Sequence, residues 1–401
     1  MLQIERLLKR CVEMDGSDLH LKTDSGKCYV RVFGDLEPLD DEPKFTQDEF
    51  DAAMSALLSP EQLKKFERDQ ELDFSLYSPG IARFRGNMYQ QRSHIQAAFR
   101  VIPLRIQSME ELNLPEACYD YVTRPRGLVL VTGPAGSGKS TSLAAMIDRI
   151  NRTQSVHIVT VEDPLEFVHE DHMALMNQRE VDHDTLSFAN ALKFVLRQDP
   201  DVILVGEMRD LDTIHLAITA AETGHLVFAT LHTVDAVQTV DRIVDVFPIH
   251  QQQQIRMQLS VNLLGVVSQT LVKKIDGNGR VAAFEVLNAT SAVRNQIREN
   301  KTYQISSIIQ TGSKQKMRTL DQSLAMLVEQ GLVDKEHARS RAKDSSEFLR
   351  MLNLAKESKQ GKGQAAVEAP PVEAPPEQDG EPKAPATGVK GQPNRPGYRR
   401  E

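Results

Sequence analysis

The alternation of apolar and polar residues is most regular in the middle of the chain. Short runs that are apolar on both faces alternate there with segments of helical spacing. The predicted strands are GLVLVTG (127–133), VHIVTVED (156–163), DVILVGE (201–207) and HLVFATLH (225–232), and helical patterns begin near residues 139, 185, 211 and 235. Buried runs connected by helices are typical of a mostly parallel sheet covered on both sides. We therefore predict an α/β domain.

A longer helical pattern runs from about residue 250 to 355 and begins with IHQQQQIRMQLSVNLLGVVSQTLV. Its spacing predicts helices, interrupted by a hairpin around DGNGR (276–280). We assign these helices to the α/β domain, which then spans residues 115–355.

Residues 1–103 predict a separate α+β domain. The opening MLQIERLLKRCVEM is broken by charged residues, so it predicts an amphipathic helix rather than a signal peptide. KCYVRVFGDLEPL (27–39) alternates like strands around a turn, residues 46–70 have helical spacing with a break at Ser59-Pro60, and residues 71–103 alternate like a strand meander.

Two segments lie outside these predicted domains. Residues 104–114 are the predicted linker between them. Residues 356–401 are rich in Pro, Gly and mixed charge and contain almost no large apolar residue. Such a segment cannot bury enough surface to offset the entropy of ordering, so we predict a disordered tail.

Composition narrows the class of protein. The chain is 40% hydrophobic and 26% charged, has a net charge of −8, and carries no run near the 18 apolar residues of a membrane helix. Its three cysteines, at 11, 28 and 118, form no CxxC pair, which excludes a disulfide framework and a four-cysteine zinc module. We expect a cytosolic protein with no nucleic-acid partner and no direct membrane insertion.

GPAGSGKS (133–140) lies between a predicted strand and the helical pattern TSLAAMIDRI. This is the context that a phosphate-binding P-loop requires, and a chance glycine-rich turn would rarely fall there. Lys139 is expected at the β- and γ-phosphates, the Ser140 hydroxyl at Mg²⁺, and Thr141 at the α-phosphate. The predicted ATP site comprises Gly133, Pro134, Ala135, Gly136, Ser137, Gly138, Lys139, Ser140 and Thr141.

The strand DVILVGE ends in Glu207, in a position where a carboxylate can reach the attacking water if this strand lies beside the P-loop strand. We predict that Glu207 is the general base, with a solvated acid at a strand end as the alternative. ATPases of this kind usually carry an Asp just before that Glu, whereas this chain has Gly206.

A second predicted strand, 156–163, ends in acidic residues that can take the role of the Asp missing at position 206. TVEDPLEF (160–167) offers Glu162, Asp163 and Glu166. Magnesium keeps several of its waters, so carboxylates can act on it through that water shell. We predict that Glu162 and Asp163, with Ser140, form the metal side of the site and that Glu166 takes part in catalysis.

Two histidines flank the strand in AETGHLVFATLHT. His232 lies at its carboxyl end, where ligands of open α/β sheets bind, and we predict that it contacts the γ-phosphate. For His225, at the start of the strand, nucleotide contact and a structural role remain open. No further ligands accompany the pair, so a zinc site is not indicated.

Arginines follow the last two predicted strands of the first domain, at positions 83, 85, 92 and 100. A solvated charged face is the ordinary reading. Because that domain has no phosphate site of its own, we favour a role for Arg83, Arg85 and Arg100 at ATP held by a neighbouring subunit.

The succession GPAGSGKST, VEDPLEF, LVGEMRD and AETGHLVFATLHT resembles the P-loop, Asp box, atypical Walker B and His box of secretion-type ATPases. More narrowly, residues 1–345 resemble the type IV pilus retraction ATPases of the PilT/PilU family, including GSDLHL (16–21) and AVRNQIRE (292–299). The resemblance implies a ring-shaped homo-hexamer with a RecA-like domain and a PAS-like N-terminal domain. It also implies ATP-driven pilin depolymerisation at an inner-membrane platform protein, and hence twitching motility.

The chain departs from the PilT pattern at SHIQ (93–96), where PilT has a Gly-Ala-Gly segment, and at Val293 and Gln296 within AVRNQIRE. With the extra tail, these departures favour the PilU-like branch, an accessory ATPase that works with a PilT-like partner. Two alternatives are a regulatory subunit that binds nucleotide and barely hydrolyses it, and a RecA-like DNA helicase. The helicase is disfavoured by the pI of 5.8 and the lack of a basic, aromatic-studded groove.

Overall fold

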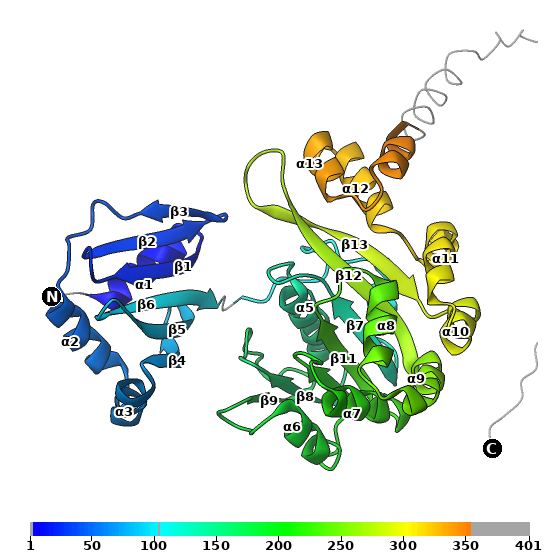
Figure 1. The fold of residues 1–401 in the computed structure, drawn as a ribbon, viewed down its shortest axis with the longest axis horizontal. Coiled ribbons are helices and arrows are strands. Elements are labelled where there is room, and N and C mark those ends of the chain that lie inside the picture. The colour runs from blue at the N-terminus through cyan, green and yellow to red at the C-terminus, as the bar shows by residue number, and fades with distance from the viewer. Residues whose placement is uncertain (1–2, 103–104, 354–401) are drawn as a thin grey trace, which may run out of the picture. The chain divides into compact units, whose positions relative to one another are not determined.

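The computed structural model describes residues 3–102 and 105–353. These are two folded domains whose position relative to one another is not determined, so each is described by itself (Figure 1). The predicted disordered tail, 356–401, lies outside the described residues, as does residue 104 of the predicted linker.

The N-terminal domain is built on an antiparallel sheet with the strand order β3-β2-β1-β6-β5-β4. The strands are β1 (Gly16–Lys22), β2 (Lys27–Val32), β3 (Asp35–Pro38), β4 (Glu71–Ser78), β5 (Ala82–Gln91) and β6 (His94–Ile102). The first and last strands of the domain, β1 and β6, pair with each other and so join the two halves of the sheet. The predicted α+β character of this domain is confirmed.

The helices of this domain are α1 (Ile4–Glu13), α2 (Gln47–Leu57) and α3 (Pro60–Asp69). Ser59 caps α3 by accepting from the Gln62 backbone N–H, and Pro60 occupies its first turn, which explains the predicted break. Leu8, Phe50 and Phe84 lie in one core between the helices and the sheet. Alternate residues of β5 enter this core, so the residues between them face the other side of the sheet.

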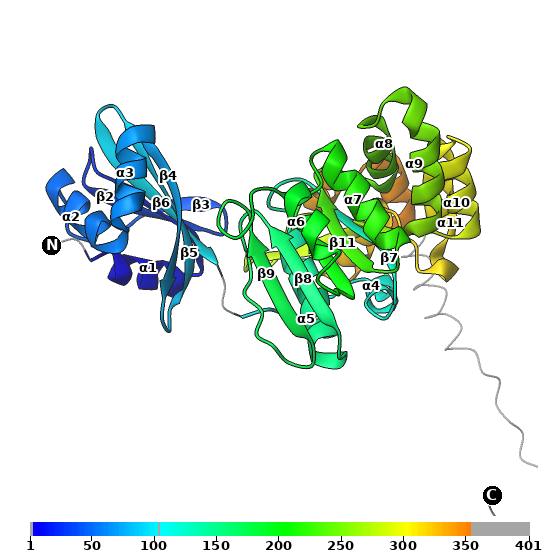
Figure 2. The ribbon, with the colours of Figure 1, turned by 90° about the horizontal axis from the view of Figure 1, so that it is seen from below.

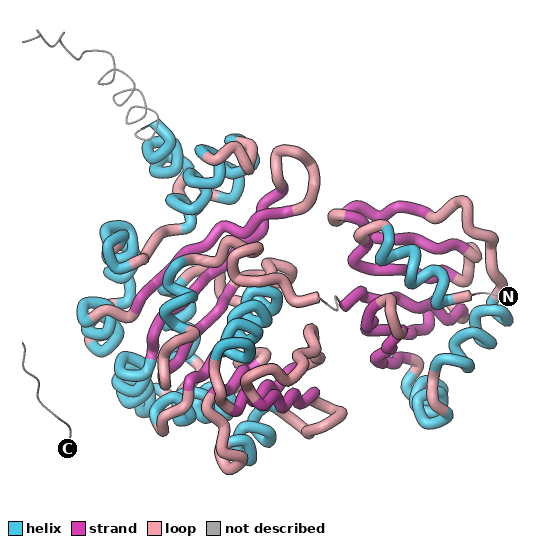
Figure 3. The backbone as a smooth tube through the Cα atoms, turned by 180° about the vertical axis from the view of Figure 1, so that it is seen from behind, coloured by secondary structure: helices cyan, strands magenta, loops and turns pink. Residues whose placement is uncertain are grey.

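The second domain contains a sheet with the order β13-β12-β7-β11-β10-β8-β9. Its strands are β7 (Gly127–Thr132), β8 (His157–Glu162), β9 (Leu175–Glu180), β10 (Val202–Val205), β11 (Leu226–Leu231), β12 (Leu263–Lys273) and β13 (Arg280–Asn288). The neighbouring strands pair in parallel, apart from the antiparallel pair β12–β13. The predicted mostly parallel α/β sheet is therefore confirmed. Figure 2 and Figure 3 show the sheet and its helices from two sides.

Helices cover both faces of this sheet. They are α4 (Glu116–Tyr121), α5 (Lys139–Thr153), α6 (Phe188–Val195), α7 (Leu211–Glu222), α8 (Ala236–Asp245) and α9 (Ile249–Asn262). Tyr121 and Ile147 pack in the core on one face, and Leu192 and Leu259 pack in the core on the other. Met109, from the predicted linker, is buried in the first of these cores.

The C-terminal part adds α10 (Ser291–Arg298), α11 (Ile305–Thr311), α12 (Leu320–Glu329) and α13 (Lys335–Arg341), with short 3₁₀ turns at Thr302–Gln304 and Ser313–Gln315. In the described ranges no helix combines the length and the apolar character needed to cross a bilayer.

The prediction of helix through LLGVVSQTLV is wrong. The helix α9 ends at Asn262, and β12 begins at Leu263 and inserts between β7 and β13. A short apolar run buried on both faces has no periodicity that separates helix from strand, and here the β-branched residues and two sheet neighbours decide for strand. The strands β1 and β9 were also not among the predicted elements.

Candidate nucleotide-binding and hydrolysis site

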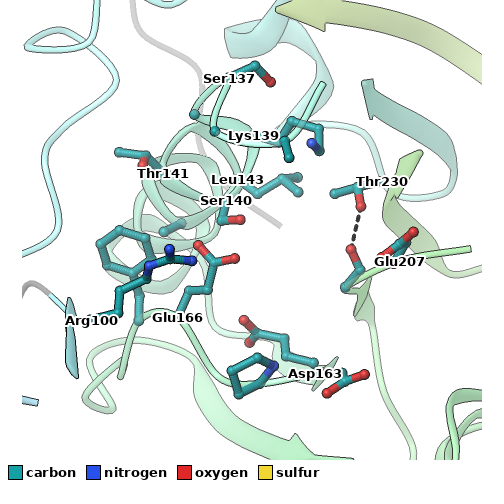
Figure 4. A pocket seen from close by; sticks show the side chains of 18 of the residues that line it. Arg100, Ser137, Lys139, Ser140, Thr141, Leu143, Asp163, Glu166, Glu207 and Thr230 are labelled. Carbon is teal, nitrogen blue, oxygen red and sulfur yellow. Dashed lines mark hydrogen bonds between the residues drawn. The ribbon is translucent and has the colours of Figure 1, made fainter. Parts of the chain in front are cut away.

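The carboxyl ends of four parallel strands bring the predicted motifs of the second domain together. The P-loop follows β7, Glu162 ends β8, Glu207 follows β10 and His232 follows β11. Lys139, Asp163 and Glu166 surround one open space with Glu207 at its side (Figure 4). Figure 4 also labels Arg100, which belongs to the N-terminal domain and is treated separately below.

One detail of the predicted strand order is wrong. The strand that carries Glu207 does not lie beside the P-loop strand, because β11 pairs with both and separates them. Glu207 is therefore two strand spacings away from β7, and His232, at the end of the intervening strand, lies next to it.

The P-loop has the backbone geometry that its glycines permit. Gly133, Gly136 and Gly138 have φ values of 145°, 72° and 87°, a region that L-residues rarely adopt. A Cβ on Gly133 would lie 2.3 Å from the carbonyl oxygen of Gln269. The glycines thus allow both the turn and its close approach to β12.

The buried polar atoms of this loop are suited to an anion. The Lys139 ammonium donates to the carbonyls of Gly133, at 2.9 Å, and Pro134, at 3.1 Å. Burial lowers the pKa of Lys139, against the opposing charges of Glu207 and Glu166. The buried Ser137 hydroxyl has no hydrogen-bond partner. A phosphate would give both groups a charged acceptor that the loop itself does not supply.

Gln269 supports the P-loop from β12 and was missed by the sequence analysis. Its Oε1 accepts from the Ser142 hydroxyl of α5 at 2.8 Å, and a Cβ on Gly138 would lie 2.7 Å from its Nε2. Because β12 was predicted as helix, no local signal could have placed this residue under the loop. Gln269 thus ties the first turn of α5 to the central sheet.

The glycine at 206 has a steric reason. A Cβ there would lie 3.1 Å from both the Glu162 Cα and the Val161 carbonyl oxygen. These are backbone atoms of the neighbouring strand, which cannot move without disturbing the sheet. An Asp side chain at this position would therefore crowd the backbone of β8.

The acids of the predicted metal side line the same pocket as Ser140, but they differ in environment. Glu162 accepts a hydrogen bond from the Thr160 hydroxyl at 2.8 Å, and burial raises its pKa to about 7. Asp163 and Glu166 are exposed. Within the described residues, no three His, Cys, Asp or Glu side chains are grouped closely enough to hold a metal ion by themselves.

Glu207 has a donor on each carboxylate oxygen. Arg209 Nη2 lies 2.7 Å from Oε2, and His232 Nε2 lies 3.1 Å from Oε1. Burial raises the pKa of Glu207, but the Arg209 hydrogen bond and the two neighbouring charges outweigh it, so the pKa is lowered overall. The carboxylate is ionised at neutral pH, as a proton acceptor must be.

His225 lies at the opposite end of β11 from His232. It precedes Leu226, which pairs with Gly127 at the start of β7, whereas the P-loop follows the end of β7. Its Nδ1 is 2.8 Å from the Ala220 carbonyl at the end of α7. The structure therefore does not bring His225 to the nucleotide pocket of its own chain.

Comparison with known proteins agrees with this geometry. The family model described as "Type II/IV secretion system protein" matches residues 92–350, more than half of the chain. The chain belongs to the type II/IV secretion system protein family. Pseudomonas aeruginosa "type IV pilus retractation ATPase PilT" is 50% identical, over 86% of this chain and 100% of that protein. The "type IV pilus ATPase PilU" of the same organism is 38% identical, over 89% and 93%.

A solved structure of this family, described as the "pilus retraction motor PilT and bound ADP", has a TM-score of 0.81 and 45% identity. The match covers 88% of this chain and 100% of the chain in the solved structure. The predicted resemblance to the PilT/PilU group is thus confirmed. The preference for the PilU-like branch is not confirmed, because the identity to PilT is the higher of the two.

The predicted trans-acting arginines of this family member lie in the N-terminal domain, on the sheet face away from its helices. Arg85 and Arg100 are paired across β5 and β6, and Arg83 is two residues along. Arg100 bonds Asp18 at 2.9 Å, yet 68% of its side chain is exposed. Arg85 lies 3.9 Å from Asp73. The structure thus gathers the arginines on one exposed face within their own domain.

Proposed function

We propose that this chain is an ATPase that drives retraction of type IV pili by pilin depolymerisation. The names of its relatives state ATPase activity and pilus retraction for those proteins. The observation that carries the proposal is the arrangement of Lys139 and Glu207 at one pocket. Lys139 lies at the start of α5 with only carbonyl partners, and Glu207 lies across the sheet edge as an ionised base.

The residues divide the work of hydrolysis. Lys139 and the P-loop N–H groups hold the β- and γ-phosphates, and Thr141 supports the α-phosphate. Glu207 orients the attacking water and accepts its proton, while His232 fixes the second carboxylate oxygen and faces the γ-phosphate. Glu166 lines the same pocket, where we propose that it takes part in catalysis. Glu207 and His232 follow buried strands, and Lys139 and Thr141 lie in the first turn of α5, so the secondary structure keeps these groups in place.

Mg²⁺ fits the donors present. Ser140 supplies a hydroxyl, and Glu162 and Asp163 supply carboxylates that line the same pocket. Hydroxyl, carboxylate and water oxygens are the ligands that this ion prefers, and it needs few direct protein ligands. When bound, Mg²⁺ supplies positive charge that offsets the charge on the phosphates.

We propose further that the active form is a homo-hexameric ring. The exposed arginine face of one N-terminal domain then supplies Arg83, Arg85 and Arg100 to ATP held by the next subunit. The same proposal places the ring in the cytoplasm at the inner-membrane face of the pilus machine, with a platform protein and a PilT-like ATPase as partners. In this proposal the chain consists of an N-terminal domain (1–103), a linker (104–114), the ATPase domain (115–355) and a tail (356–401).

The test is the ATPase activity of the purified chain with magnesium, beside Lys139→Ala and Glu207→Ala. We expect turnover by the wild type and its loss in both variants. Lys139→Ala should also lose nucleotide affinity, whereas Glu207→Ala should keep it, because of these two residues Lys139 alone contacts the phosphates in the ground state. A wild-type chain that binds ATP without turnover would instead support the regulatory-subunit alternative.

The identity to PilT favours a motor that retracts pili by itself over an accessory role. The departures at SHIQ and in AVRNQIRE, which favoured the PilU-like branch, are the contrary signal. Expression in cells that lack their own retraction ATPases separates the two. Recovered twitching supports the autonomous motor, and recovery only with a PilT-like partner supports the accessory role.

A further inference from the structure

Arg209 lies beside the proposed general base and was not singled out in the sequence. It is the second residue after Glu207 and directly precedes Asp210, the N-cap of α7. Asp210 caps that helix by accepting from the Thr213 backbone N–H at 2.9 Å. The Met208 N–H donates to the Thr230 carbonyl at 3.0 Å, and the Gly206 N–H donates to the Val161 carbonyl at 2.7 Å. The backbone on both sides of Glu207 and Arg209 is therefore fixed.

The two side chains meet above this fixed backbone. The Arg209 guanidinium is 2.7 Å from Glu207 Oε2, and its other terminal nitrogen is 4.0 Å from Asp163. Only 17% of the Glu207 side chain is exposed, against 61% for Arg209. The exposed arginine thus contacts one oxygen of a mostly buried carboxylate, and His232 contacts the other oxygen.

A carboxylate that acts as a base needs one orientation and a negative charge. A glutamate side chain has several rotatable bonds, so holding it in one orientation has an entropic cost that its hydrogen-bond partners must offset. Charge-assisted hydrogen bonds to partly buried groups are among the stronger polar contacts in proteins. Each carboxylate oxygen can accept more than one hydrogen bond, so the contact with Arg209 leaves Glu207 able to accept from water.

We propose that Arg209 is a positioning residue for hydrolysis, which holds the Glu207 carboxylate in its working orientation and does not bind nucleotide itself. The inference rests on the ATPase function proposed above. It assigns the Arg of the LVGEMRD motif to the base, rather than to the phosphates or to a surface ion pair.

The first experiment measures kcat, KM for ATP and ADP affinity for Arg209→Gln and Arg209→Lys. Arg209→Gln should lower kcat about tenfold or more, while KM and ADP affinity stay within about twofold, because the base acts only in the chemical step. Arg209→Lys keeps a cation near Glu207 and should recover part of kcat. Arg350→Gln is the matched control, since Arg350 bonds Glu347 at 2.8 Å and its side chain is 66% exposed.

A second measurement asks whether Arg209 acts through Glu207. In a Glu207→Gln background, adding Arg209→Gln should change the residual kcat by less than about twofold. A further large loss would mean that Arg209 acts on the phosphates, and it would overturn the proposal. Unchanged or increased kcat in Arg209→Gln alone would overturn it as well, as would a loss that appears in KM.

Two other results are distinguished by the same measurements. If the wild-type chain shows no turnover, the ATPase function itself fails and the role of Arg209 fails with it. If Arg209→Gln loses ADP affinity and melts earlier than the control, Arg209 maintains the fold instead, which also contradicts the proposal.

Discussion

At the scale of single residues, packing decides which chemistry a position can carry. Gly206 lies where the Walker B motif usually has an acid, but a side chain there would crowd the backbone of β8, with its Cβ 3.1 Å from two backbone atoms. The acids that we propose for the metal side, Glu162 and Asp163, lie instead at the carboxyl end of β8. Burial raises the pKa of Glu162, the last residue of that strand, whereas Asp163, the next residue, is exposed.

Restoring the usual acid at position 206 should harm the protein. In Gly206→Asp the new Cβ would meet backbone atoms at 3.1 Å, and we expect a loss of about 1–3 kcal/mol in the free energy of unfolding. ATP turnover should fall as well, because β8 and Glu162 are displaced. Urea denaturation and an ATPase assay measure both effects, and Gly206→Ala should lose less. An aspartate variant as stable and active as the wild type would contradict the steric explanation.

The raised pKa of Glu162 predicts that the stability of the protein depends on pH in the absence of magnesium and nucleotide. Its folded-state pKa, about 7, is above the usual 4.5, so the native state binds the extra proton between these values. Stability should therefore fall as pH rises from about 4.5 to 7 and level off above, by at most about 3 kcal/mol.

Glu162→Gln removes that titration. In urea unfolding with EDTA present, the wild type should be less stable at pH 8 than at pH 5. The variant should lack the part of this loss that comes from Glu162. If the wild type and the variant followed the same pH profile, the burial of Glu162 would not control this titration.

At the scale of elements, the junction of α9 and β12 depends on one side chain from a distant helix. Arg294 of α10 donates to the carbonyls of Ser260, Val261 and Leu263, and through Nε to Ala289 at 2.8 Å. The last carbonyls of a helix lack partners within it, and the guanidinium satisfies several of them together. This gives a structural role to the arginine of AVRNQIRE.

Arg294→Ala should lower the free energy of unfolding by about 1–3 kcal/mol, because it leaves partly buried carbonyls without donors. Arg294→Lys should recover little, since one ammonium cannot reach several carbonyls at once. The control on the same helix is Arg298→Ala, because Arg298 makes a single 3.3 Å contact to Asn295. Equal losses for the two alanine variants would mean that the capping contacts contribute little.

At the scale of the whole molecule, the exposed arginines and the hydrolytic site lie in different domains. The proposed ring requires that one subunit supply arginines to the site of the next. This arrangement has a direct consequence for mixed assemblies, in which two inactive chains can complement each other.

Chains with Arg85→Ala and Arg100→Ala together should be inactive alone, as should Glu207→Ala chains. In a one-to-one mixed ring, about a quarter of the interfaces would combine an intact base with intact arginines from the neighbour. ATP turnover should then recover to about a quarter of the wild-type rate. No recovery, in rings shown to be mixed, would mean that the arginines act within their own chain or not at all.

The sequence by itself determined the features that contiguous residues encode. GPAGSGKS specifies its loop because its glycines permit the φ values that the loop needs, and the apolar strand DVILV and its following Glu207 indicate a base at a sheet edge. Only the tertiary structure decided that LLGVVSQTLV is a strand and that β11 separates β7 from β10. It also decided that Gln269 supports the P-loop and that Arg209 and His232 meet on Glu207. These contacts depend on strand order and on burial from both faces, and neither leaves a periodic signal in the chain.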